Sequence, residues 1–295
     1  MKKVIFRGIA TALVTPTNEM GVDYKKLAAL IDWQIEQGIN ALVICGTSGE
    51  SSTLTDTEHR KVIDFSVQQA AGRVPVIAGT GSNETDYAVS LTQSAYCSGA
   101  DAALVVTPYY NKTTQRGLIK MYNLIADCSP LPIIMYNVPS RTGINIEPST
   151  CAALAEHENI VALKEAGGNI SKIVETAALV GDRLTLYSGN DDQIVPILSM
   201  GGQGCISVLS NVMPAQTVEI TDRFFAGDVA GSAELQCRYL PLIQALFCEV
   251  NPIPVKAAMA ALGWCEDYLR LPLLPMEDAN RERLLAEMRK LGLNV

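Results

Sequence analysis

The segment Ile160-Val161-Ala162-Leu163-Lys164 places a lysine directly after four apolar residues, of which two are β-branched. Such a run is typical of a strand that is buried on both faces, as in a parallel sheet. An ammonium group at the end of this strand loses hydration, which favours the neutral amine, and a neutral amine can attack a ketone to form a Schiff base. Alternatively, the stem of Lys164 packs on the strand while its charged end reaches water. Its position alone does not decide between the two.

Similar apolar runs recur along the chain and alternate with segments of helical periodicity. Eight strands are predicted, at residues 8–14, 41–45, 74–78, 102–107, 132–137, 160–164, 184–188 and 204–208. Helices are predicted between them, at residues 24–37, 55–71, 84–98, 115–127 and 148–156. Eight strand–helix units at intervals of roughly 25–35 residues favour an α/β fold, a (β/α)8 TIM barrel, over an open doubly wound sheet. No Gly-x-Gly-x-x-Gly motif follows the first strand, which disfavours a dinucleotide-binding fold.

The strand signals stop after about Phe225, and the rest of the chain is predicted to be helical, at residues 229–250, 254–262 and 279–291. Pro254 suits the first turn of a helix and Gly263 suits a helix end. We therefore expect a barrel catalytic domain over residues 1–225 and a smaller C-terminal helical domain over residues 226–295.

Composition excludes several classes of function. The 23 basic and 31 acidic residues give a formal charge of −8, the opposite of a nucleic-acid-binding surface. No apolar run approaches membrane-spanning length, and the N-terminal segment is too interrupted for a signal peptide. The eight cysteines form no Cys-x-x-Cys pair and the two histidines lack metal-ligand spacing. We expect a cytoplasmic protein without a metal site and without nucleic-acid or membrane partners.

Chemistry in a barrel takes place at the carboxyl ends of the strands, and polar residues gather at these predicted ends. The second strand runs into Gly46-Thr47-Ser48-Gly49-Glu50-Ser51. The backbone N–H groups of this turn could bind a small anion, or it could be a plain strand-to-helix turn with Thr55 or Asp56 as the helix cap. The fourth strand ends in Thr107-Pro108-Tyr109-Tyr110-Asn111, and the fifth runs through Tyr136 to Gly143.

Period-two alternation predicts that Tyr136 and Lys164 both face the barrel interior. A phenol beside a cationic amine can donate and accept protons, although a single half-buried tyrosine more often bonds to backbone. Arg141, in the loop after the fifth strand, could bind a carboxylate or remain in a solvated surface pair. Glu165 points to the opposite face of its strand and is not expected to be a base. Asp191 begins a helix in which carboxylates are expected as caps, not as metal ligands.

Together these motifs resemble the dihydrodipicolinate synthase family, within the class I aldolase superfamily that also contains N-acetylneuraminate lyase. The resemblance covers essentially the whole chain and includes the segments 8–16 and Asn251-Pro252-Ile253-Pro254-Val255-Lys256. It implies a lyase of the diaminopimelate route to lysine, which condenses pyruvate with L-aspartate 4-semialdehyde to 4-hydroxy-tetrahydrodipicolinate. It also implies no cofactor, because pyruvate forms a covalent imine on Lys164, and a homotetramer built from tight dimers.

The resemblance further implies roles for individual residues. Lys164 forms the imine, and a hydroxyl relay moves the protons, with one tyrosine supplied by a neighbouring subunit. The catalytic residues implied are Lys164, Tyr136, Ser48 and, from the neighbour, Tyr110. Thr47 and Ser48 hold the pyruvate carboxylate, Arg141 holds the carboxylate of the semialdehyde, and backbone contacts come from Gly189 and Ile206.

Two departures from the family pattern concern the relay and regulation. Ser48 stands where threonine is common, so its hydroxyl is kept but its rotamer is less restricted. An allosteric lysine site of the family maps onto Ser51, Ser52, Leu54, Asp56, His59, Asn83, Tyr87 and Tyr109. Of these, Ser51, His59, Asn83 and Tyr109 are candidate lysine contacts. His59 and Asn83 match lysine-sensitive members of the family, whereas Tyr87 replaces a usual glutamate and Asp56 a usual histidine, so the sequence leaves inhibition by lysine open.

Two other functions compete with the synthase. One is a different pyruvate-dependent class I aldolase, of the N-acetylneuraminate lyase or keto-deoxy sugar acid type, and Arg141 disfavours it because a polyol needs no arginine there. The other is a non-catalytic pyruvate-binding regulator, which the four intact catalytic residues disfavour.

Overall fold

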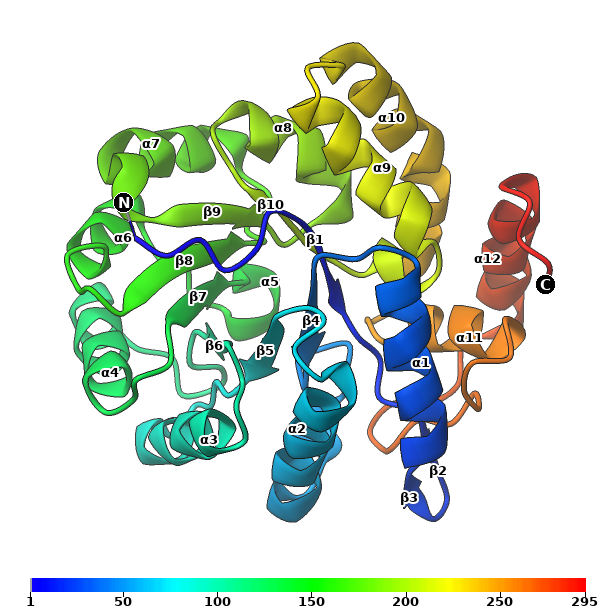
Figure 1. The fold of residues 1–295 in the computed structure, drawn as a ribbon, viewed down its shortest axis with the longest axis horizontal. Coiled ribbons are helices and arrows are strands. Elements are labelled where there is room, and N and C mark those ends of the chain that lie inside the picture. Colours follow the sequence, from blue (N-terminus) through cyan, green and yellow to red (C-terminus); the bar gives the residue numbers. More distant parts are fainter. Residues whose placement is uncertain (1) are drawn as a thin grey trace.

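The computed structural model describes residues 2–295 and contains eight parallel strands closed into a barrel, as predicted (Figure 1). The order around the barrel is β1-β10-β9-β8-β7-β6-β5-β4, and β4 pairs with β1 to close it. The strand ends differ from the predicted ones by at most two residues. The strands are β1 Gly8–Ala12, β4 Ala41–Ile44, β5 Val76–Gly79, β6 Ala102–Val106, β7 Ile133–Asn137, β8 Ile160–Glu165, β9 Thr185–Ser188 and β10 Gly204–Ser207.

Helices surround the barrel, so each strand is covered on its outer side (Figure 1). Five of them match the predicted helices to within two residues: α1 Tyr24–Glu36, α2 Asp56–Ala70, α3 Thr85–Cys97, α4 Gln115–Asp127 and α6 Pro148–Leu154. Three more complete the ring and are not among those predicted: α7 Ile170–Val180, α8 Ile194–Ser199 and α9 Pro214–Phe225. Short elements fill the loops, namely the hairpin of β2 Thr17–Asn18 and β3 Gly21–Val22, and α5 Pro139–Thr142.

Local sequence explains where these helices begin. Thr55 caps α2 with a full capping box, because its side chain accepts from the backbone N–H of Glu58 and the Glu58 carboxylate accepts in return. Thr114 caps α4 and Asn169 caps α7, each with one side-chain oxygen that accepts from a backbone N–H of the first turn and without the reciprocal bond.

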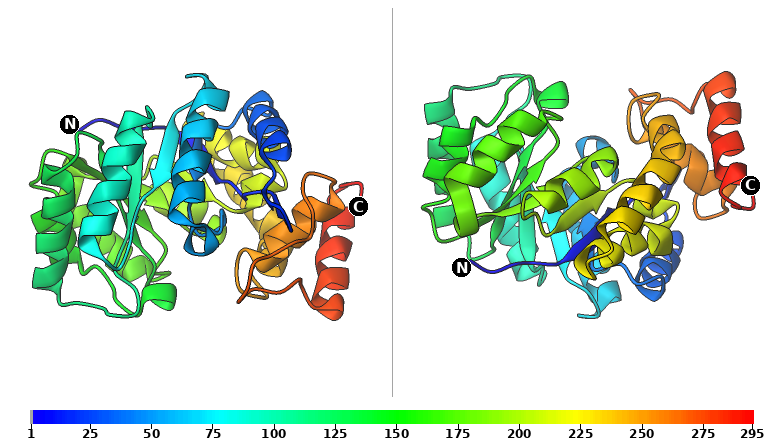
Figure 2. Two further views of the ribbon diagram at one scale, coloured as in Figure 1. Left: turned by 90° about the horizontal axis from the view of Figure 1, so that it is seen from below. Right: turned by 90° about the horizontal axis from the view of Figure 1, so that it is seen from above.

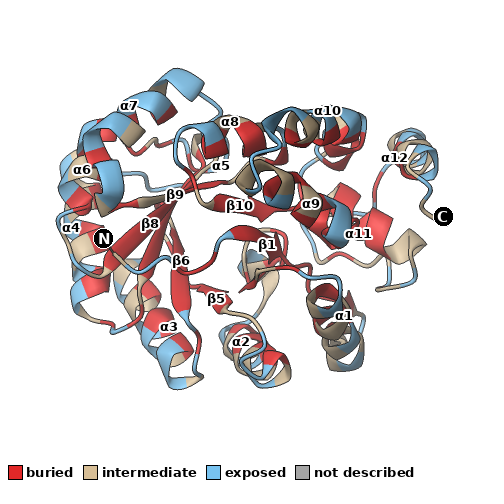
Figure 3. Ribbon diagram, turned by 45° about the horizontal axis from the view of Figure 1, so that its top comes forward, coloured by how far each residue is buried: buried red, intermediate tan, exposed pale blue. Residues whose placement is uncertain are grey.

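The strands are almost wholly buried, while the helices have one buried and one exposed side (Figure 3). Inside the barrel, side chains from alternate strand positions form one apolar cluster, and a second cluster fills the layer between strands and helices. Before β1 the N-terminal segment crosses one end of the barrel (Figure 1). There the Phe6 ring stacks on the Tyr187 ring with centroids 4.2 Å apart, and the Tyr187 hydroxyl donates to the Phe6 carbonyl at 2.7 Å.

The C-terminal helices lie together on one side of the barrel (Figure 2). They are α10 Val229–Leu246, α11 Ile253–Ala261 and α12 Asp278–Lys290. The first was predicted four residues too long, because the chain leaves the helix after Leu246 and turns back toward the barrel mouth. Since α10 packs on α8 and α9, we propose that residues 226–295 are an appendage of the barrel. No helix within residues 2–295 is both long and apolar enough to cross a membrane.

Candidate active site

A cavity of about 150 Å³ lies at the carboxyl-terminal mouth of the barrel. It receives residues from the ends of β4, β7, β8 and β9 and from the loop after α10. Its polar lining consists of Thr47, Ser48, Tyr136, Ser140, Arg141, Lys164, Asn190 and Asn251. The structure therefore brings together five residues that the sequence identified, Thr47, Ser48, Tyr136, Arg141 and Lys164, and Gly189 also lines the cavity.

Lys164 and Tyr136 are side by side in the barrel wall. They are register partners in the β7–β8 pair, and both side chains turn inward, as the alternation predicted. The Lys164 Nζ atom lies 4.2 Å from the centre of the Tyr136 ring, a distance at which a cation is attracted to an aromatic face. Lys164 is only 6% exposed and Tyr136 7%. The alternative in which Lys164 extends into water is therefore wrong.

Gly189 provides the space that the lysine stem occupies. A Cβ atom at this position would lie 3.1 Å from Lys164 Cε and 2.7 Å from Ala166 Cβ, both too close for an unstrained side chain. A glycine at this position thus makes room for Lys164, and the contact of its backbone with a ligand stays a prediction. Ile206 is fully buried in the barrel interior, and its side chain belongs to the inner cluster, away from the cavity lining.

The turn after β4 is closed by two overlapping backbone bonds. Gly49 N–H donates to the Gly46 carbonyl and Glu50 N–H to the Thr47 carbonyl, each at 3.1 Å. Ser48 is buried within this turn. The cap of α2 is Thr55, as one of the two interpretations expected, but that cap lies beyond the turn and leaves Thr47 and Ser48 at the cavity.

Asn251 is a site residue to which the sequence assigned no role. Its side-chain Nδ2 donates to Ser48 Oγ at 3.1 Å, and its backbone carbonyl accepts from Arg141 Nη2 at 2.9 Å. Asn251 therefore links the turn after β4 to the loop after β7, and it fixes the guanidinium at the cavity. The only sequence signal was its place at the head of the motif that continues to Lys256.

Tyr110 does not join this cluster. Its side chain is 92% exposed, and its backbone has a φ of 68°, in the left-handed region that non-glycine residues seldom adopt. The chain before it, at Thr107, is buried and bonded to the Thr142 hydroxyl at 2.9 Å. The loop thus carries Tyr110 outward from a buried, hydrogen-bonded base.

A second cavity of about 470 Å³ adjoins the first, since Thr47, Val138 and Arg141 line both. It also contains six of the predicted regulatory positions: Ser51, Ser52, Leu54, His59, Tyr87 and Tyr109. Asn83 is not in its lining. Asp56 also lies outside it and accepts a hydrogen bond from the Tyr87 hydroxyl at 2.9 Å. Burial lowers the pKa of His59, whose Nε2 lies 2.8 Å from the Gly79 carbonyl oxygen.

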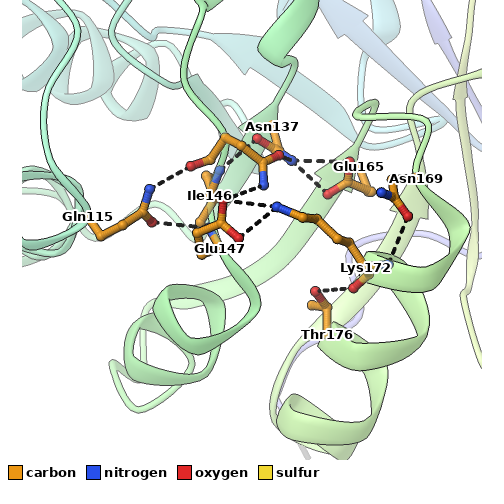
Figure 4. Close-up of polar contacts among 9 residues, drawn as sticks. Gln115, Asn137, Ile146, Glu147, Glu165, Asn169, Lys172 and Thr176 are labelled. Carbon is orange, nitrogen blue, oxygen red and sulfur yellow. Dashed lines mark hydrogen bonds and ion pairs between the residues drawn. The ribbon is translucent and has the colours of Figure 1, made fainter.

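Glu165 lies on the face opposite Lys164, as predicted, and joins a polar network at the ends of β7 and β8 (Figure 4). Asn137 Nδ2 donates to both Glu165 carboxylate oxygens, at 3.1 and 2.9 Å, and Gly167 N–H donates to one of them at 2.5 Å. Burial raises the pKa of Glu165, although these bonds oppose the shift. The network continues through Asn145 to Glu147, which pairs with Lys172 at 2.8 Å.

Asp191 also acts as a structural acceptor. Its buried carboxylate accepts from the backbone N–H groups of Val208 and Leu209, each at 2.9 Å, and burial raises its pKa. The capping interpretation was correct in kind, but the turn that Asp191 caps is the one after β10 and not the one that it begins.

The fold and the position of this cluster define a (β/α)8-barrel protein with a polar pocket and a buried lysine at its carboxyl-terminal mouth. A family model described as the dihydrodipicolinate synthetase family matches residues 5–291. The chain therefore belongs to the dihydrodipicolinate synthetase family, and the resemblance seen in the sequence is confirmed.

Individual relatives are similar over nearly their whole length. A 4-hydroxy-tetrahydrodipicolinate synthase of Lachnoclostridium phytofermentans is 53% identical over 291 residues, which is 98% of this chain and 99% of the relative. The crystal structure of dihydrodipicolinate synthase from Aquifex aeolicus has a TM-score of 0.96 at 45% identity and covers 98% of this chain and 99% of its own. The chloride-inhibited synthase of Acinetobacter baumannii, complexed with pyruvate, has a TM-score of 0.96 at 41% identity, with 99% and 100% covered.

Proposed function

We propose that this protein condenses pyruvate with L-aspartate 4-semialdehyde to give 4-hydroxy-tetrahydrodipicolinate, through an imine on Lys164. The observation that carries the proposal is the buried amine of Lys164 against the Tyr136 ring, in a chain 53% identical to a synthase of that activity. An amine enclosed in this way is a nucleophile for a ketone, and the neighbouring phenol can exchange protons with the addition product.

The reaction divides into steps that these groups can serve. Attack of Lys164 Nζ on the keto carbon of pyruvate gives a carbinolamine, and loss of water from it gives the imine. Removal of a methyl proton gives the enamine, whose carbon attacks the aldehyde of the second substrate. The amino group of that substrate then attacks the imine carbon, which closes the ring and releases Lys164 as the free amine. Each step moves a proton at the lysine nitrogen, the departing oxygen, the methyl carbon or the new alkoxide, so a group such as the Tyr136 hydroxyl is needed beside the amine.

The two substrate carboxylates have separate partners in this scheme. The turn that carries Thr47 and Ser48 offers hydroxyl and backbone donors to the pyruvate carboxylate. Arg141 offers a planar pair of donors to the carboxylate of the semialdehyde, and its bond to the Asn251 carbonyl leaves its other N–H groups free to bind. The overall charge of −8 repels both anions, so these local donors must supply the attraction.

Tyr110 completes the relay in the proposal as a residue donated to a neighbouring subunit, consistent with its 92% exposure. We accordingly propose a homotetramer of two tight dimers in the cytoplasm, with no cofactor beyond the covalent imine. Gly189 and Ile206 are proposed to contribute backbone contacts to the bound keto acid. Ser51, His59, Asn83 and Tyr109 remain candidate contacts for a lysine effector.

Trapping the imine tests the proposal directly. Incubation with pyruvate and borohydride, followed by peptide mass analysis, is expected to show one reduced pyruvate adduct on Lys164. Turnover is then compared between pyruvate with the semialdehyde and cleavage of N-acetylneuraminate. Absence of the adduct would refute the imine, and preferential cleavage of the sugar acid would assign the protein to the competing class of aldolase.

A further inference from the structure

Lys256 and Glu50 form an ion pair that is closed off from solvent. The Lys256 side chain is 0% exposed and that of Glu50 1%, and Lys256 Nζ donates both to Glu50 Oε1 and, at 2.6 Å, to Thr17 Oγ1. In every other ion pair among residues 2–295 the cationic side chain is at least 21% exposed. The pair therefore stands apart from the surface pairs of this chain.

Stability alone is a weak reason for such a pair. Removing two charges from water opposes folding, and apolar side chains of similar volume often stabilise a protein equally well or better. One Glu50 oxygen, Oε2, also has no partner among the described residues. What the pair does provide is a short, directional link between segments that are far apart in the sequence.

Glu50 is the last residue of the turn that carries Thr47 and Ser48. Its N–H donates to the Thr47 carbonyl at 3.1 Å, and its own carbonyl accepts from Thr53 N–H at 3.0 Å. Its φ of 55° lies in the left-handed region, which a side chain disfavours. A side chain anchored on a buried ammonium can hold the backbone in this conformation, and that conformation determines where Thr47 and Ser48 point.

Lys256 belongs to α11, and the chain that leads into this helix carries Asn251. Asn251 contacts the same turn from its other side, through Ser48 Oγ at 3.1 Å. Turn 46–50 is therefore held at two points by one C-terminal segment, once through Asn251 inside the cavity and once through Lys256 outside it. Neither Glu50 nor Lys256 lines the cavity, so any effect on a ligand must pass through the turn.

We propose that Glu50 and Lys256 are positioning residues that pre-align turn 46–50 for the carboxylate of the keto acid. The proposal rests on the proposed function, because it assumes that this turn binds pyruvate. Pre-alignment lowers the cost of ordering the donors when the carboxylate binds. Neutralising the pair is thus expected to weaken pyruvate binding while leaving the second substrate, which is bound by Arg141, largely unaffected.

The test compares Lys256→Met, Glu50→Gln and the double variant with both changes. The double variant is central, because each single change leaves one buried charge without its partner, whereas the double change leaves none. Lys290→Met serves as the matched control, since Lys290 forms an exposed pair with Glu287 on α12 at 2.7 Å. For each protein we would measure the melting temperature, the pyruvate concentration that gives half-maximal borohydride labelling of Lys164, and KM for each substrate.

The double variant is expected to melt near the wild-type temperature and to need about tenfold more pyruvate for half-maximal labelling. A tenfold change is the size expected when about one hydrogen-bond donor to the carboxylate is no longer aligned. Its KM for the semialdehyde and the extent of labelling at saturating pyruvate are expected to stay close to wild type, as for Lys290→Met. A folded double variant with wild-type pyruvate dependence would overturn the proposal. So would a double variant that does not fold, because the pair would then serve the fold itself. Failure of the wild-type protein to be labelled would instead refute the proposed function.

Discussion

Replacing Tyr136 with phenylalanine removes one hydroxyl and leaves the aromatic ring against Lys164. The ring contributes the contact 4.2 Å from Lys164 Nζ, so the lysine keeps its position and the variant isolates proton transfer from packing. Folding stability is expected to change by no more than about 1 kcal/mol, the usual net contribution of one hydroxyl hydrogen bond. The effect should therefore fall almost entirely on the chemical steps.

The expected loss of activity follows from the usual contribution of one acid–base group to the reaction rate. A positioned acid–base group contributes about 10²–10⁴-fold to rate, which is about 2.7–5.4 kcal/mol of transition-state stabilisation. We expect kcat to fall in this range for Tyr136→Phe with a small change in KM for pyruvate, because the carboxylate donors are untouched. Steady-state turnover gives kcat, and the time course of borohydride labelling on Lys164 gives the rate of imine formation separately.

Tyr122→Phe is the matched control. Tyr122 is fully buried on α4, and its hydroxyl donates to the Val105 carbonyl at 3.0 Å on the helix side of the sheet, so the side chain itself does not line the cavity. This change is expected to cost about 1 kcal/mol of stability and to leave kcat near the wild-type value. Near-normal turnover of Tyr136→Phe would refute the acid–base role, and equal losses in both variants would mean that the effect arises from packing.

Three further outcomes are expected. Lys164→Ala should abolish labelling by pyruvate and nearly all turnover, as measured by adduct mass and product formation; persistent labelling elsewhere would assign the imine to another amine. Glu165→Ala should destabilise the fold by about 1–3 kcal/mol in urea unfolding, because Asn137 Nδ2 loses a charged acceptor. Glu165→Gln keeps an acceptor oxygen and should have a stability near that of the wild type. Equal losses of stability in the two variants would contradict this reasoning. Two hydrogen bonds from Arg270 lower the pKa of Glu58 to about 2. The ion pair therefore stabilises the fold fully above pH 4.5, the usual pKa of a glutamate, and this stabilisation is lost as the pH falls toward 2. Because the Arg270–Glu58 pair is partly solvated, we expect it to add about 1–2 kcal/mol to the free energy of unfolding. Glu58→Gln should remove this pH dependence from the unfolding curves. An unchanged pH dependence would exclude Glu58 as its source.

The barrel could be predicted because its strands are short apolar runs, and such runs in alternation with amphipathic helices have few other solutions. Of the three helices that were missed, α8 has the weakest sequence signal. α8 spans only Ile194–Ser199 and contains Pro196, and it is followed by Gly201 and Gly202, so its sequence resembles a loop. α7 presents Ile170 and Val174 to solvent, but its apolar and polar residues still lie on different sides as clearly as in the predicted helices, so its pattern alone does not explain why it was missed.

The site was predictable where strand alternation placed a side chain and not where distant segments meet. Tyr136 and Lys164 follow from the period of two on adjacent strands. The contact of Asn251 with Ser48 spans 203 positions in the sequence, and no local pattern encodes it. Likewise, the space for Lys164 that requires Gly189 is a property of packing between β8 and the loop after β9, which appears only in three dimensions.

The stacked rings of Phe6 and Tyr187 determine from which end of the barrel substrates can enter and products can leave. With both rings buried and the Tyr187 hydroxyl bonded to the N-terminal segment, the barrel axis is plugged, and only the mouth remains as a portal. The same opening must then admit the keto acid and the aldehyde and release the water and the product. Both substrates therefore reach Lys164 and Arg141 from the same side of the barrel, where the two residues line one cavity.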